Sequence, residues 1–164
     1  MYEIDTYVFH THCGVCKIVG IAPLSGDDSG NLYYVLSPFH GDDKNNIVRV
    51  PVDNPASLRR PLNKQQANDL IDKWPNIREN LYIADSKARK VAYENALRSG
   101  YVEDLATLME GALQRKARDG HLNSMDAQFV NRAMPIVYGE LGFALEIPVQ
   151  DVPAYIRQKT GFPA

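Results

Sequence analysis

Short extended runs broken by turn residues dominate the first third of the chain. Between the runs lie loops rich in Gly, Asp, Ser and Asn, at residues 23–30 and 40–46, and these residue types favour turns. The runs are rich in the β-branched and aromatic residues that fit a pleated strand, and they cover residues 7–9, 15–21, 31–36 and 46–52. Four or five short strands without a helical period predict a small β-barrel.

The last of these runs, at residues 46–52, combines a strand pattern with two irregular residues. Val48 and Val50 are β-branched, but Pro51 has no backbone donor, so the strand is expected at the edge of a sheet or to end there. Arg49 places a charge in the middle of the run, where a strand does not need one. A proline-blunted edge with an outward arginine favours a docking surface over a pocket.

After residue 55 the hydrophobic residues follow a helical period. Trp74 lies on the apolar face of the first helix and is expected in the core, and Pro75 is expected to end that helix. Gly100 stands where glycine commonly follows a helix end. Apolar residues recur at helical spacing, which predicts helices at residues 64–74, 84–98, 102–118, from 123 onward, and a short one at 152–158. The expected fold class is α+β, with a β-barrel at residues 1–56 and an all-α bundle at residues 62–164.

Charge divides the chain in the same way. The formal net charge is −2, which argues against a protein that coats nucleic acid by charge alone. Residues 1–56 carry a net charge of −4 and the remainder +2, as two modules with different partners would. There is no apolar run long enough for a bilayer, no signal sequence, and only two cysteines. We therefore expect a cytoplasmic protein that does not contact a membrane.

A group of histidines and cysteines is the first candidate for chemistry. His10, His12, Cys13 and Cys16 lie within seven residues, and a zinc site takes four such ligands, whereas a Cys-x-x-Cys pair can also be a redox centre. Neighbours in an extended run point to opposite faces, and redox pairs of this kind normally open a helix. We expect ordinary turn and strand residues, with no metal or cofactor. Without a phosphate loop or a hydrolase motif, the chain is not expected to be an enzyme.

The second candidate is a basic segment at residues 86–90. Lys87, Arg89 and Lys90 are close enough on a helix for two or three cations to share one face. Such a face is either simply solvated or contacts the phosphates of DNA. Three phosphate contacts give a log–log salt slope of only about −3, so this patch cannot hold DNA unaided.

Motifs in both halves of the chain resemble the CarD/CdnL family of bacterial transcription regulators. The first half has YVFHTHCGVCKIVGI, YYVL and VRVPVDN, in that order, beginning at residues 7, 33 and 48. The second half has ALRSG, LATLMEGALQRK, LNSMD and GEL, beginning at residues 96, 105, 122 and 139. The first half is similar to the Tudor-like RNA-polymerase-interacting domain that this family shares with transcription-repair coupling factors.

The resemblance implies a monomeric adaptor with two contact surfaces. The barrel would dock on the β-subunit lobe of RNA polymerase, with Arg49 aligned to the family's polymerase-contacting arginine and Val48, Val50 and Pro51 beside it. The helical domain would contact promoter DNA and modulate the stability of the open complex. The expected DNA-contacting residues are Lys87, Arg89, Lys90 and Ser86. Ser86 occupies the position where many members of the family carry a wedge-forming tryptophan.

The resemblance further implies a cytoplasmic protein that associates with the nucleoid through RNA polymerase. Two alternatives remain. One is a module that binds polymerase without acting on DNA, which Ser86 at the wedge position would allow. The other is a small zinc or redox protein that uses His12, Cys13 and Cys16.

Overall fold

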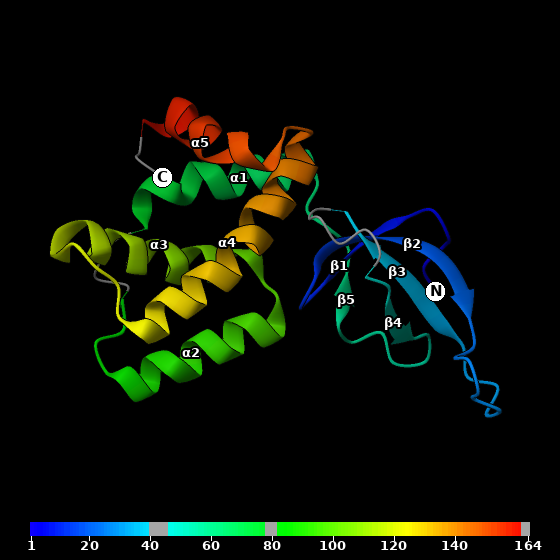
Figure 1. Ribbon diagram of the computed structural model, residues 1–164. Coiled ribbons are helices and arrows are strands. Elements are labelled where there is room, and N and C mark those ends of the chain that lie inside the picture. Colours follow the sequence, from blue (N-terminus) through cyan, green and yellow to red (C-terminus); the bar gives the residue numbers. More distant parts are fainter. Residues whose placement is uncertain (40–45, 78–81, 162–164) are drawn as a thin grey trace. The chain divides into compact units, whose positions relative to one another are not determined.

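The change in hydrophobic period near residue 55 corresponds to a division of the structure into two units. In this computed structural model, unit 1 comprises Met1–Pro61 and unit 2 comprises Leu62–Ala164 (Figure 1). The structure describes residues 1–39, 46–77 and 82–161, so most of the second predicted loop lies outside the described residues. The first domain was expected to end at residue 56, but unit 1 continues through one further strand.

Unit 1 is a curled antiparallel half-barrel. Its strands are β1 (Tyr7–His10), β2 (Gly14–Ala22), β3 (Tyr33–Pro38), β4 (Val48–Pro51) and β5 (Leu58–Arg59). They pair in the order β4-β3-β2-β1-β5, so β4 and β5 form the two edges. A register shift between Ile18 and Gly20 interrupts the pairing of β2 with β3, and such a bulge bends a sheet. The predicted strands are present, with ends within two residues of those expected.

Alternation along the strands builds the core of unit 1. Val8 on β1, Ile18 on β2, Tyr34 on β3 and Val50 on β4 point to the same face, because successive side chains of a strand point to opposite faces. Leu58 on the short strand β5 completes this face. The core therefore includes a residue from every strand.

The described residues of unit 2 form helices and no strand, which together with the sheet of unit 1 confirms the predicted α+β class. Its elements are α1 (Lys64–Lys73), η1 (Trp74–Asn76), α2 (Ser86–Ser99), α3 (Val102–Asp119), α4 (Ser124–Leu145), η3 (Val149–Asp151) and α5 (Val152–Thr160). Asn63 caps α1 in a capping box with Gln66, and Gly100 ends α2 in the left-handed conformation. Trp74 is fully buried, as expected. Among the described helices, none combines the length and hydropathy needed to cross a bilayer.

A buried carboxylate joins the first turn of α4 to α2. Asp126 accepts hydrogen bonds from Arg89 Nε at 2.9 Å and from the Tyr93 hydroxyl at 2.8 Å. Its other oxygen accepts one from the Tyr82 hydroxyl at 2.8 Å. Burial first, and then the bond to Asp126, raise the pKa of Tyr93, so its hydroxyl stays a donor. This Asp126 network (Asp126, Arg89, Tyr93 and Tyr82) fixes how α2 lies against α4.

A second buried carboxyl lies on α3. Glu110 is only 3% exposed, and its Oε2 atom has no hydrogen-bond partner among the described residues; the same holds for Nε1 of Trp74. Burial raises the pKa of Glu110, and the Gln114 and Trp74 side chains oppose that shift. Because burial is the largest of these effects, the neutral form of this carboxyl group is favoured.

Removal of the Asp126 carboxylate is expected to destabilise the protein strongly. Asp126→Ala leaves the buried Arg89 guanidinium without a counter-charge, and breaking a buried pair in this way costs about 3–5 kcal/mol. Tyr82→Phe removes one hydrogen bond of the same network and should cost about 1 kcal/mol. Urea unfolding of both variants measures the difference, and equal losses would contradict the central role of the ion pair.

Glu110→Gln is expected to stabilise the protein increasingly as the pH rises. The folded state holds the proton of Glu110 more tightly than the unfolded chain does. The resulting stability is complete below the ordinary pKa of 4.5 and is lost as the pH rises through the raised value. Thermal unfolding between pH 4 and pH 8 measures this pH dependence, with Glu94→Gln, at an exposed glutamate, as control. A difference between wild type and Glu110→Gln that does not change with pH would contradict the assignment.

Candidate functional site

Strand β4 is an edge strand whose two faces differ. Arg49 and Pro51 are exposed, whereas Val50 is only 4% exposed and Val48 packs partly against the core. Arg49 lies opposite Val35 in the register with β3. The outward face of β4 therefore presents an arginine and a proline.

The hydrogen-bond pattern decides which backbone atoms of β4 point outward. The Val52 amide donates to the Leu32 carbonyl at 2.9 Å, so every second residue of β4 bonds toward β3 in an antiparallel ladder. Val48 and Val50 belong to that set, and the backbone donor and acceptor of Arg49 point to the free edge. Pro51 is tolerated because its missing donor would also lie on the free side, and its carbonyl accepts from the Asn54 amide.

Among the four docking residues expected from the sequence, Val50 is buried, and Val48 is half-buried and stays a prediction. Val50 directs its side chain into the core and its backbone toward β3, so it cannot touch a partner. Val48 directs its backbone toward β3 as well, and its side chain packs partly against the core. Arg49 and Pro51 are the residues that β4 offers to the outside.

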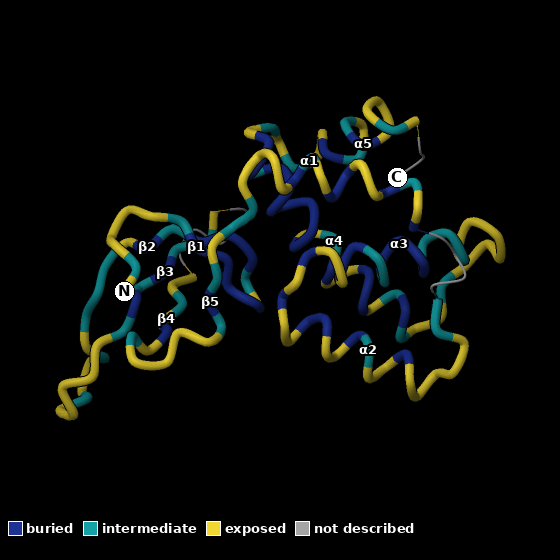
Figure 2. The backbone as a smooth tube through the Cα atoms, turned by 180° about the vertical axis from the view of Figure 1, so that it is seen from behind, coloured by how far each residue is buried: buried dark blue, intermediate teal, exposed yellow. Residues whose placement is uncertain are grey.

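The first two turns of α2 present the candidate DNA-contacting lysines. Asp85 caps the helix by accepting from the Lys87 and Ala88 amides at 2.8 and 3.2 Å. Ser86, Lys87 and Lys90 are exposed, and buried and exposed positions alternate along this helix (Figure 2). The two lysines share one face because they are three residues apart.

Arg89 is not part of that exposed surface, and its predicted role as a DNA contact is wrong. The residue is 4% exposed. Its Nε atom bonds to Asp126 at 2.9 Å, one of its terminal nitrogens donates to the Ile83 and Ala84 carbonyls, and its guanidinium lies 4.5 Å from the centre of the Tyr82 ring. Arg89 holds α2 in place and so positions Lys87 and Lys90.

The histidines and cysteines lie at the hairpin between β1 and β2. The His12 amide donates to Nδ1 of His10 at 3.3 Å, and burial, with the nearby His12, lowers the pKa of His10. Burial raises the pKa of Cys13, and it raises that of Cys16 to about 12. A reactive thiol needs a lowered pKa. Within residues 1–39, 46–77 and 82–161, no three His, Cys, Asp or Glu side chains converge on a possible metal site, so the arrangement gives a zinc or redox function no support.

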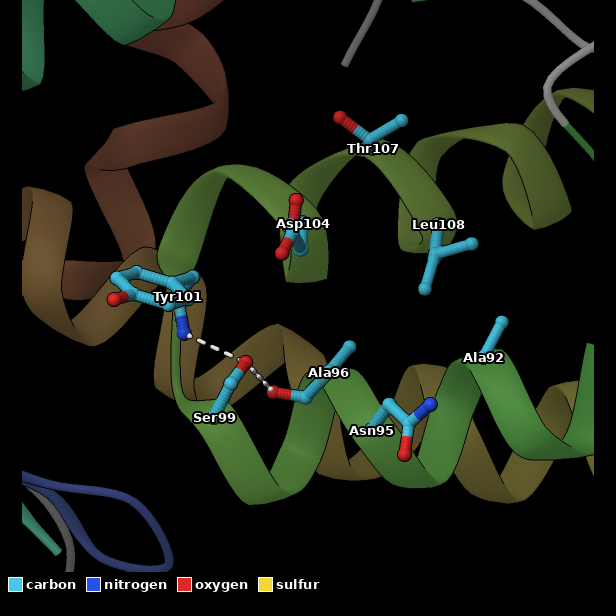
Figure 3. A pocket seen from close by; sticks show the side chains of 8 residues that line it. All are labelled: Ala92, Asn95, Ala96, Ser99, Tyr101, Asp104, Thr107 and Leu108. Carbon is cyan, nitrogen blue, oxygen red and sulfur yellow. Dashed lines mark hydrogen bonds between the residues drawn. The ribbon is translucent and has the colours of Figure 1, made fainter. Parts of the chain in front are cut away.

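A shallow groove of about 490 Å³ runs between α2 and α3 (Figure 3). Asp104 contributes a carboxyl group to it, and Ser99 closes the turn between the helices by accepting from the Tyr101 amide and donating to the Ala96 carbonyl. The lining residues are mostly small or polar: Ala92, Asn95, Ala96, Ser99, Tyr101, Asp104, Thr107 and Leu108. The groove brings together no pair of catalytic groups.

Sequence patterns missed the Asp126 network, although one signal for it was present. Asp126 lies in the first turn of α4, where its backbone amide donates to the side chain of the cap residue Asn123. Arg89 lies four, seven and eight residues before Tyr93, Ala96 and Leu97, which are the buried residues of α2. That spacing places Arg89 on the buried face, where an arginine requires an acidic partner.

The comparison with known families covers the strand-containing part of the chain, a little over a third of its length. The family model of the CarD-like/TRCF RID domain matches residues 2–62, a range that contains all five strands of unit 1. No curated protein matches the chain. The match ends where the helical unit begins. Unit 1 therefore belongs to the CarD-like/TRCF RID family and is a CarD-like RNA-polymerase-interacting domain.

Proposed function

We propose that this protein is a bacterial transcription regulator that docks on the β-subunit lobe of RNA polymerase through β4 and contacts promoter DNA with α2. The observation that carries the proposal is the free edge of β4 within a CarD-like RNA-polymerase-interacting domain. Polymerase binding follows from the domain family. We add to it three proposals: that the partner is the β-subunit lobe, that the protein contacts promoter DNA, and that it changes the stability of the open complex.

The edge of β4 favours a short added strand. An extended segment of the partner can pair with the outward backbone donor and acceptor of Arg49, which is β-augmentation. Pairing cannot continue past Pro51, because it lacks a donor and its carbonyl accepts from Asn54. Ile47, two residues before Arg49, is 42% exposed and offers the partner an apolar side chain. The Arg49 side chain then supplies specificity through an acidic group of the partner.

The DNA contact is weaker than the sequence predicted. With Arg89 buried, Lys87 and Lys90 remain, and two phosphate contacts give a log–log salt slope of about −2. Such a contact becomes effective when docking on polymerase makes it intramolecular. In the cell, the protein would then be found with polymerase on the nucleoid, in the cytoplasm.

Arg49→Glu is expected to weaken binding to the isolated β lobe by about ten-fold or more, because it places a like charge against an acidic partner. The Arg49 side chain is exposed, so the thermal midpoint should not change. Arg60→Glu, at another exposed arginine of unit 1, is the matched control. If the wild-type protein shows no affinity for the lobe, the proposal is wrong.

Lys87→Ala combined with Lys90→Ala is expected to shorten the lifetime of the open promoter complex and to leave affinity for the β lobe unchanged. Each lost phosphate contact lowers the salt slope by about 0.9. Lys64→Ala, at an exposed lysine of α1, is the control. Arg89 must stay intact because its loss disturbs the fold. An unchanged lifetime would favour a module that docks on polymerase without acting on DNA.

A further inference from the structure

The groove between α2 and α3 exists because the two helices meet through small side chains. Gly100 ends α2 and Tyr101 is the cap of α3, so the helices are consecutive neighbours that run in opposite directions. Ala92 and Leu108 extend toward each other from the two helices (Figure 3), and Ala96 beside them is only 4% exposed. Because alanine has a single methyl group, it leaves a groove of about 490 Å³ where a larger side chain would fill the space.

Exposed apolar side chains flank this groove. Among the described residues of unit 2, the large hydrophobic side chains that are exposed are Val91 and Tyr101, at 54% and 63%. Tyr101 lines the groove. Val91 directly precedes Ala92 and lies one turn before Asn95, and both of these residues line the groove. Apolar side chains that gather in the open around a hollow are typical of a protein interaction site.

Tyr101 contributes little to the fold. As the cap residue of α3 it makes no side-chain capping bond, and Ser, Thr, Asp or Asn would cap the helix better. Its ring is mostly exposed, so it adds little to the core of unit 2. A tyrosine that serves neither the cap nor the core agrees with a role in binding, because tyrosine is enriched among the residues that dominate protein interfaces.

Asp104 is the charged residue among those that line the groove. It forms no ion pair with a described residue, whereas its neighbour Glu103 pairs with Lys73 at 3.4 Å. On the other wall, Arg98 donates to Asn95 at 3.3 Å, so a cation of the partner is favoured on the α3 side. A complementary partner therefore carries a lysine or arginine opposite Asp104.

The walls favour a helix as the occupant over an extended strand. Both walls are α-helices, whose backbone donors and acceptors bond within each helix away from its ends, so they offer no edge for strand pairing. A helix already satisfies its own backbone and needs only side-chain contacts. Tyr101 and Leu108 are seven residues apart, about 10 Å along α3. That length matches two apolar side chains seven residues apart on the occupant.

We propose that the groove between α2 and α3 binds an amphipathic helix of a protein partner. The apolar face of that helix contacts Val91, Tyr101 and Leu108, and a lysine or arginine beside that face pairs with Asp104. The exposed lysines of α2 are not among the lining residues, so occupation of the groove leaves the proposed DNA contact in place. The inference concerns a further partner and does not depend on binding to polymerase or to DNA.

A pair of helical peptides tests the proposal on the full-length chain. Both carry leucines spaced i, i+4 and i+7, and they differ at one flanking position, which is lysine in one and glutamate in the other. The lysine peptide should bind about five-fold more tightly and should shift the ¹⁵N-amide resonances of residues 91–108. Asp104→Lys should reverse the preference between the peptides. The matched control is Glu103→Lys, which makes the same change in the same turn outside the groove lining and should keep the wild-type preference.

Tyr101→Ser separates binding from folding. Serine is a better cap than tyrosine, so the thermal midpoint should stay or rise, whereas the affinity for the lysine peptide should fall about ten-fold. If neither peptide shifts the resonances of residues 91–108, or if Asp104→Lys leaves the order of affinities unchanged, the proposal is wrong. If tumbling of the free protein slows with its concentration and Tyr101→Ser abolishes that effect, a second copy fills the groove, and this outcome also overturns the proposal.

Discussion

The buried ion pair between Arg89 and Asp126 is the interaction on which the surface of unit 2 depends. Two opposite charges removed from water stabilise a structure only when their geometry is satisfied. Here the carboxylate also takes the Tyr82 and Tyr93 hydroxyls, so few arrangements of α2 against α4 meet the requirement. With α2 held in this orientation, Lys87 and Lys90 face solvent. One buried arginine thus determines which of its neighbours can meet a partner.

In unit 1, the corresponding constraint is the backbone. A half-barrel of five strands leaves an edge at β4, and an open edge exposes donors and acceptors that attract another strand. Pro51 has no backbone donor, so pairing with another strand can extend along only one side of Arg49. The edge therefore suits a short strand and resists the continuous pairing that leads to aggregation. The same residue that weakens the strand limits how far backbone pairing along this edge can extend. The edge of β4 and the lysines of α2 thus give each unit a surface of its own.

Local patterns accounted for most of the secondary structure, and they failed where distant residues determine the outcome. The C-terminal end of α2 follows from Gly100, and the edge position of β4 follows from Pro51, since both effects act through the nearest backbone groups. Arg89 was misassigned because its partner Asp126 lies 37 residues away. Val50 was misassigned because the register with β3, not the strand pattern, decides which backbone atoms point outward.

The sequence by itself determined the change from strands to helices near residue 55, the edge character of β4, the exposed lysines of α2 and the resemblance of unit 1 to a polymerase-interacting domain. Each depends on residue type and spacing within a few positions, where propensity and periodicity are strong. Only the tertiary structure decided that Arg89 is structural and that Val50 turns inward. Those outcomes depend on burial and on partners far away in the chain. The sequence shows which charged and amide groups are present, and the folded structure decides which of them are buried and therefore need a hydrogen-bond or ionic partner.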